Sequence, residues 1–136
     1  MNYLNLIDIR EHLGTLKRSS SIDNKSGYFE KVFFNHFNIE LHASNVSLCE
    51  PRDNYDCLLH YQKIQLALYE DIREQEHAIS PCIDTRFSGF DWTKYFVYYN
   101  SKGIKKPSYM GEYVPVAEVC QLIRDVYKVS RLKIFY

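Results

Sequence analysis

The sequence predicts an α+β fold, with about three helices packed on a small mixed or antiparallel sheet, in a single domain over residues 1–136. Hydrophobic residues recur at steps of three and four in some segments, which is typical of amphipathic helices. In other segments they alternate with polar residues, which is typical of strands. The length and the 46% of hydrophobic residues are those of one ordinary globular domain. We therefore expect one shared hydrophobic core.

The first predicted element is a helix over residues 5–16. Its hydrophobic residues fall on one stripe, which should face the core: Leu6, Ile9, Leu13 and Leu16. The polar, turn-rich segment 17–27 that follows is predicted to be a loop.

The second element is a strand from His36 to Ala43, where hydrophobic and polar residues alternate strictly. One set should face the core: Phe37, Ile39, Leu41 and Ala43. The other set should point away from it: His36, Asn38, Glu40 and His42. Without a function, this second set would be the solvated face of an edge strand.

A long helix is predicted next, from about Asp53 to Glu74. Asp53 or Asn54 can cap its first turn after Pro51. Hydrophobic residues then line one helical face: Cys57, Tyr61, Ile64, Leu68 and Ile72.

The segment 92–99 (WTKYFVYY) has strong strand propensity, and residues 109–114 are predicted to pair with it as a hairpin. Pro107 would confine that partner strand to the edge of a sheet. A third helix follows over residues 115–128, because Pro115 suits a first helical position and apolar residues recur at helical spacing after it. Alternation in residues 129–136 predicts a closing strand and hence a strand–helix–strand crossover.

Composition excludes several classes of protein. Seventeen basic residues balance seventeen acidic ones, so no overall field attracts nucleic acid, which we expect not to be the partner. Charges interrupt the first 14 residues, where a signal peptide would be apolar, and no run of about 18 apolar residues could span a membrane. We therefore expect a soluble, cytoplasmic protein whose four scattered cysteines are reduced. Abundant residues with A/T-rich codons suggest a mobile genetic element as origin.

One candidate site lies on the outward face of the predicted strand. Residues two apart on one strand face are about 7 Å from each other, so Glu40 and His42 could share a metal ion or a substrate. A metal site needs a third ligand, which the sequence does not place, and His36 on the same face is a further candidate. Imidazole nitrogens and carboxylate oxygens are proper zinc or iron ligands. These residues therefore suggest a small-molecule-binding domain or a metal-dependent hydrolase.

The other candidate site is aromatic. Tyr and Trp anchor many protein interfaces, and both faces of the predicted hairpin carry them. The candidate surface consists of Trp92, Tyr95, Tyr98, Tyr99, Tyr109 and Tyr113. Lysines are interleaved at positions 94, 102, 105 and 106, so stacking on single-stranded nucleic acid is a further alternative.

The leading hypothesis is a non-enzymatic domain that uses this aromatic surface to bind a protein partner or a second copy of itself. Glycine-rich phosphate loops, zinc-protease motifs, nucleophile elbows and calcium-binding loops are all missing from the sequence. We therefore expect no cofactor, and binding rather than catalysis.

Overall fold

The protein is described by a computed structural model, which places residues 6–18, 28–87, 95–99 and 108–131. Within these residues, six strands form one sheet in which every pair is antiparallel. They are β1 (Val32–Phe34), β2 (Phe37–His42), β3 (Lys63–Ile72), β4 (Gln75–Ile79), β5 (Phe96–Tyr99) and β6 (Ser108–Pro115). Their order across the sheet is β1-β2-β3-β6-β5, and β4 pairs with the second half of β3. The predicted α+β class is confirmed, with an antiparallel sheet.

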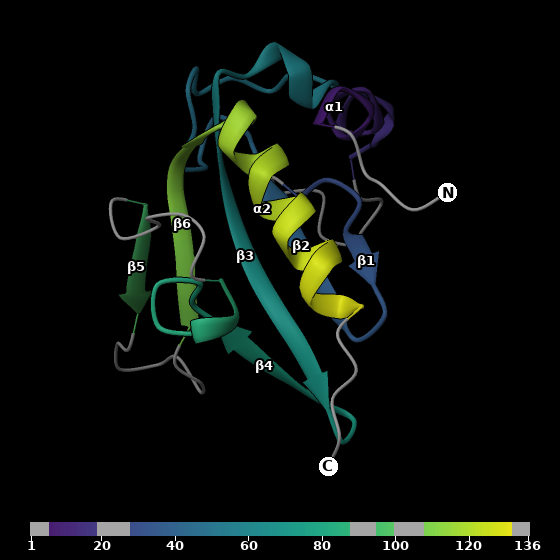
Figure 1. The fold of residues 1–136 in the computed structure, drawn as a ribbon. Coiled ribbons are helices and arrows are strands. Elements are labelled where there is room, and N and C mark those ends of the chain that lie inside the picture. The colour runs from purple at the N-terminus through teal and green to yellow at the C-terminus, as the bar shows by residue number, and fades with distance from the viewer. Residues whose placement is uncertain (1–5, 19–27, 88–94, 100–107, 132–136) are drawn as a thin grey trace.

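The described part of the chain forms two α-helices, α1 (Leu6–Thr15) and α2 (Val116–Ser130), which lie on one face of this sheet (Figure 1). Helix α2 runs across β1, β2 and β6, while α1 packs beside α2 and beside the short 3₁₀ turn η1 (Leu58–His60). A second 3₁₀ turn, η2 (Thr85–Phe87), also contacts α2. Neither described helix is long and apolar enough to cross a membrane.

The hydrophobic core fills the space between the helices and the sheet. Helix α1 buries Ile9 and Leu13 there, and α2 buries a full stripe from Val116 to Val129. Strand β2 contributes its predicted inward set, Phe37, Ile39 and Leu41, and Ala43 follows in the same core. The first predicted helix, the strand at 36–43 and the third helix are therefore confirmed.

The predicted helix over residues 53–74 is wrong. Only η1 is helical there, and residues 63–72 form β3, the long strand that pairs with β2 on one side and with β6 and β4 on the other. A spacing of four is also two strand repeats, so Ile64 and Leu68 fit both patterns. Leu66, which is fully buried between them, fits only the strand. Pairing on both edges outweighs the helical propensity of this segment.

Two strand predictions also change. The hairpin of β5 and β6 is confirmed, with Tyr98 opposite Tyr109, but β6 is internal because it also pairs with β3. Helix α2 continues through Ser130, so the predicted closing strand cannot begin at Val129. Residues 132–136, which would form the rest of the last strand in the predicted strand–helix–strand crossover, lie outside the described part of the chain.

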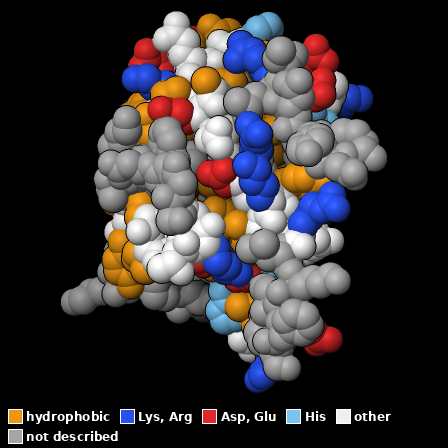
Figure 2. Space-filling view, viewed as in Figure 1, with side chains coloured by type: hydrophobic (Ala, Val, Ile, Leu, Met, Phe, Trp, Pro, Cys, Tyr) orange, Lys and Arg blue, Asp and Glu red, His pale blue; other side chains and the backbone are white. Residues whose placement is uncertain are grey.

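On the helix-bearing side, charged side chains of both signs are scattered among hydrophobic ones over the described surface (Figure 2). This mixture agrees with the balanced composition of seventeen basic and seventeen acidic residues. The lysines at 94, 102, 105 and 106, which the nucleic-acid hypothesis needs, lie outside the described residues.

Candidate functional site

The sheet face that points away from the helices carries polar side chains that are largely buried. Because β2 lies between β1 and β3, it is not the predicted edge strand. Asn38 is only 2% exposed, and the side chains of Glu40 and His42 are 14% and 13% exposed. Opposite them on β3 are Tyr69, Ala67 and Gln65. The predicted solvated face is therefore a packed polar surface.

Glu40 is the central group of this surface. The Tyr69 hydroxyl donates a hydrogen bond to its carboxylate, and the positive charge of Lys31 lies nearby. Burial nevertheless raises the pKa of the Glu40 carboxyl above its usual range, against the opposing effects of Lys31 and Tyr69. A carboxyl group in this setting can accept a hydrogen bond, and carboxyl groups with shifted pKa values are common at functional sites.

His42 lies beside Glu40 and is held in its neutral form. Its Nε2 is 3.9 Å from a carboxylate oxygen of Glu40, which is too long for a hydrogen bond. The ring packs edge-on against Tyr28, with centroids 4.1 Å apart. Burial and then the charge of Lys31 lower the pKa of His42 to about 4. Among the described residues, the buried Nε2 has no hydrogen-bond partner.

Asn38 extends the polar surface toward β4. Its Nδ2 donates a 3.3 Å hydrogen bond to the carboxylate of Glu76, whereas its buried Oδ1 has no partner in the described structure. Buried polar atoms are normally paired, so two unpaired atoms on one strand face need an explanation.

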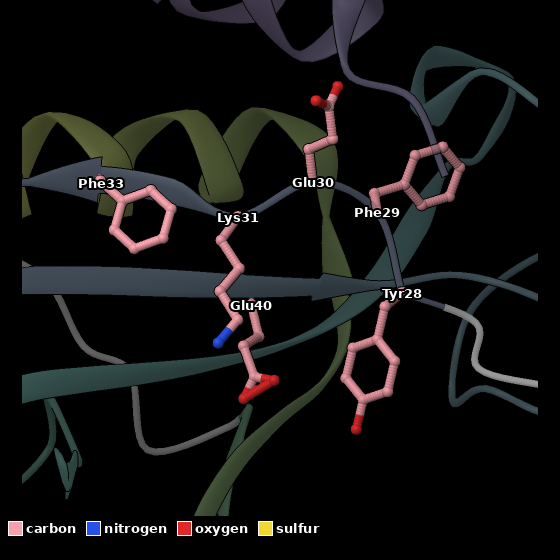
Figure 3. A pocket seen from close by; sticks show the side chains of 6 residues that line it. All are labelled: Tyr28, Phe29, Glu30, Lys31, Phe33 and Glu40. Atoms are coloured by element: carbon pink, nitrogen blue, oxygen red, sulfur yellow. The ribbon is translucent and has the colours of Figure 1, made fainter. Parts of the chain in front are cut away.

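The surface opens into a hollow of about 480 Å³, which we call the Glu40 hollow. It is lined by Tyr28, Phe29, Glu30, Lys31, Phe33 and Glu40. Figure 3 shows Tyr28, Lys31, Phe33 and Glu40 pointing to the same side of the sheet, away from α2, whereas Phe29 and Glu30 point to the other side. Alternation is interrupted at Glu30 and Lys31, between the Tyr28–His42 bridge and β1, so Tyr28 points to the same side as Lys31 and Phe33.

The hollow therefore combines a carboxyl group, an ammonium group and aromatic rings. No family model, curated protein or solved structure matches this chain. What the hollow can do chemically therefore follows from its own residues.

The structure brings together two of the three predicted metal candidates. Glu40 and His42 are neighbours, but the chain turns at Asn35, whose φ is 53°, and His36 lies in that turn. His36 Nε2 is 2.8 Å from a carboxylate oxygen of buried Glu70. No cluster of three His, Cys, Asp or Glu side chains in the described residues could hold a metal ion. The metal site with His36, Glu40 and His42 stays a prediction.

Glu70 belongs to a separate ion-pair network on the core side of the sheet. Arg86 donates hydrogen bonds of 2.9 and 2.8 Å to the two carboxylate oxygens of Glu70, and two more, of 2.9 and 2.6 Å, to the carboxylate of Asp84. These hydrogen bonds lower the pKa of Glu70, although burial opposes them. The network ties η2 to β3, which is a structural role.

The six aromatic candidates occupy several different environments. Trp92 and the Tyr99 side chain lie outside the described residues. Tyr98 is 50% exposed and its ring is 5.1 Å from that of Tyr109, which packs against the core, as does Tyr95. The hydrogen bond between Tyr95 and Glu118, with burial, raises the pKa of Tyr95 to about 12. Tyr113 accepts a hydrogen bond from Arg52.

Sequence reasoning missed Tyr28, Lys31, Phe33 and Tyr69. The position of Lys31 follows from the register of the β1–β2 hairpin. A two-residue turn at 35–36 pairs Phe34 with Phe37, and the same register places Lys31 opposite Glu40. Tyr69 was missed because its segment was predicted to be a helix. Its contact with Glu40 depends on the pairing of β2 with β3.

Proposed function

We propose that this protein is a small-molecule-binding domain whose ligand occupies the Glu40 hollow. One observation carries the proposal: a mostly buried carboxyl group lies beside an imidazole nitrogen that has no partner among the described residues, next to an open, aromatic-lined hollow. Binding sites commonly combine apolar walls with a few such convergent polar groups whose pKa values are shifted.

The energetic argument supports a ligand. Leaving a buried polar atom without a hydrogen bond costs about 1–3 kcal/mol. Within the part of the chain that the structure describes, the face of β2 carries two such atoms, on Asn38 and His42, where apolar side chains would avoid that cost. Protein features that reduce stability without a structural benefit are concentrated at functional sites. Asn38 and His42 do not line the hollow itself, so binding would offset this cost where side chains move to bring these atoms to the ligand.

The walls of the hollow support the same conclusion. Phe33 is 66% exposed, although a phenylalanine side chain is strongly apolar, and the partly exposed ring of Tyr28 lies on the same side of the sheet (Figure 3). Aromatic rings of this kind supply contact area and stacking to an organic ligand.

Thermal unfolding with a metabolite panel tests this proposal. The panel contains amino acids, sugars, nucleosides, polyamines and short carboxylic acids. At least one compound, at about 100 times its Kd, should raise the Tm by several degrees. The shift should be kept in the control variant Glu11→Gln, which removes an exposed carboxylate on α1, and lost in Glu40→Gln. Equal shifts in all three proteins, or no shift with any compound, would contradict the proposal.

A second candidate function is the binding of a protein partner or a second copy through the aromatic surface. It is supported by β5, which ends the strand order and carries exposed Val97 and Tyr98. Edge strands with exposed hydrophobic side chains are templates for association. Light scattering should then detect a dimer that Tyr98→Ala weakens. A monomer at every concentration, with Tyr98→Ala affecting stability alone, argues against this candidate.

We also infer a single domain in the cytoplasm. All four cysteines are free thiols, and buried Cys49 and Cys120 are part of the core cluster, as expected in a reducing compartment. Both helices and the sheet contribute to the same cluster. Limited proteolysis that leaves one resistant core would support the single domain, and two stable fragments would refute it.

A further inference from the structure

The Glu40 hollow presents opposite charges on one wall. Lys31 precedes β1 and Glu40 lies on β2, and both side chains line the hollow and point to the same side of the sheet (Figure 3). Within these described residues, no ion pair of 4.0 Å or less joins the Lys31 ammonium to the Glu40 carboxylate. Each charged group therefore keeps capacity for a further partner.

We propose that the ligand of the hollow is a zwitterion, a small molecule with both an amino group and a carboxylate, such as an amino acid. Its ammonium group binds Glu40, its carboxylate binds Lys31, and its apolar part lies against Phe33 and Tyr28. This inference rests on the proposed function and specifies the ligand class.

Charge complementarity selects this class over simpler ions. A ligand with only a positive charge would gain from Glu40 but would be repelled by Lys31 a short distance away. A ligand with only a negative charge would be attracted by Lys31 but repelled by Glu40. A zwitterion places each of its charges beside an opposite one, and like-charge contacts are an effective means of rejecting wrong ligands.

The surroundings of Glu40 suit it to bind an ammonium group. The Tyr69 hydroxyl donates to the carboxylate and fixes its orientation from β3. His42, whose pKa is lowered to about 4, stays uncharged at neutral pH and does not neutralise Glu40. Charge-assisted hydrogen bonds to a carboxylate held in this way are stronger than those between neutral groups.

The exposed ring of Phe33 indicates that the ligand also carries an apolar group. This side chain is 66% exposed on the short strand β1, at the rim of the hollow. A ligand side group packed on it would remove that apolar surface from water, which is favourable in proportion to the area buried. We therefore expect amino acids with hydrophobic side groups to bind better than glycine.

Isothermal titration calorimetry with matched compounds tests the inference. The zwitterions are L-phenylalanine and L-leucine. Phenethylamine and 3-methylbutylamine lack the carboxylate, and 3-phenylpropionate and 4-methylpentanoate lack the amino group. At least one amino acid should bind, and both of its analogues should bind about ten-fold more weakly or worse, because each loses a charge-assisted hydrogen bond.

Single variants test whether Glu40 and Lys31 are the residues that bind the two charged groups of the ligand. Glu40→Gln and Lys31→Met should each weaken amino-acid binding about ten-fold or more, whereas Lys128→Met, which removes an exposed lysine on α2, should leave it unchanged. A folded thermal transition in each variant separates lost binding from lost structure. An amino acid that binds all variants equally would overturn the inference.

The outcomes also distinguish this inference from the proposed function. If an amine or a carboxylate binds as tightly as its parent amino acid, or if only uncharged compounds bind and do so through Glu40, the zwitterion is wrong and the ligand-binding function stands. If neither these compounds nor the metabolite panel binds at Glu40, both are wrong.

Discussion

The carboxylate of Glu40 and the imidazole of His42 lie 3.9 Å apart, and yet they do not behave as an ion pair. In an ion pair, the positive imidazolium would lower the pKa of the carboxyl group, and the negative carboxylate would raise the pKa of the imidazole. Here burial raises the pKa of Glu40 and lowers that of His42. Burial therefore opposes the charged form of each group, and the charge of the other group does not outweigh it.

The first prediction concerns the pH dependence of stability. The pKa of His42 is about 4 in the folded protein and near 6.5 when exposed, so the unfolded chain binds the extra proton first. The stability from neutral His42 is fully present above pH 6.5 and is lost as the pH falls toward 4, by roughly 3 kcal/mol in all. Urea unfolding of the protein and of His42→Gln at pH 7 and 4.5 measures this loss.

The variant should lose much less stability than the natural protein over this range. Glu40 acts in the opposite direction, because its raised pKa gives stability at low pH that is lost as the pH rises. Glu40→Gln should therefore lose more stability on acidification than the natural protein. Equal pH dependence in His42→Gln and the natural protein would refute this account of His42.

The second prediction concerns the buried Glu70. Replacing Arg86 by alanine removes both hydrogen bonds to a carboxylate that is almost fully buried, and should reduce the free energy of unfolding by about 3–5 kcal/mol. The double variant Arg86→Met with Glu70→Leu should lose less, because the almost fully buried Glu70 carboxylate is then absent, although Asp84 loses Arg86 in both variants. Chemical denaturation measures both. If Arg86→Ala reduced the free energy of unfolding no more than the double variant does, the ion-pair network would contribute little to stability.

The third prediction tests β3 as a central strand. Leu66→Ala should cost about 2–5 kcal/mol because Leu66 is fully buried in the core, whereas Ile72→Ala at the exposed end of the strand should cost far less. A helix over residues 53–74 would put Ile72 on the apolar face and Leu66 on the opposite face, and would reverse this order. Denaturation of the two variants decides between them.

The fourth prediction concerns the turn between β3 and β4. Arg73 and Glu74 have φ values of 52° and 66°, the left-handed pair that a two-residue type I′ hairpin requires. Asn and Gly adopt these angles at lower cost. The double variant Arg73→Asn with Glu74→Gly should therefore raise the free energy of unfolding by about 1 kcal/mol. An unchanged or lower Tm would contradict the assignment of strain to this turn.

The sequence predicted those elements whose periodicity has only one structural solution. The alternation from Phe37 to Ala43 excludes a helix, and the stripe from Val116 onward excludes a strand. Ile64 and Leu68 fit both periods, so only the pairing of β3 with its neighbours decides. Local pattern cannot supply that pairing, which joins residues far apart in the chain.

The candidate site was predictable only where local spacing along one strand places its residues together. Glu40 and His42 share one strand face, so spacing alone places them together. Lys31 and Tyr69 reach Glu40 from the strands on either side, through a hairpin register and a long-range pairing. The burial of this face, which shifts both pKa values, arises from those neighbours.

Mapping of ligand binding by NMR tests the central claim most directly. The ¹⁵N-labelled protein is titrated with the compounds of the metabolite panel. The account predicts saturable shifts in the amide signals of Tyr28, Lys31, Phe33 and Glu40, absent in Glu40→Gln. Shifts confined to β5 around Val97 and Tyr98, or no saturable shift with any compound, would contradict it.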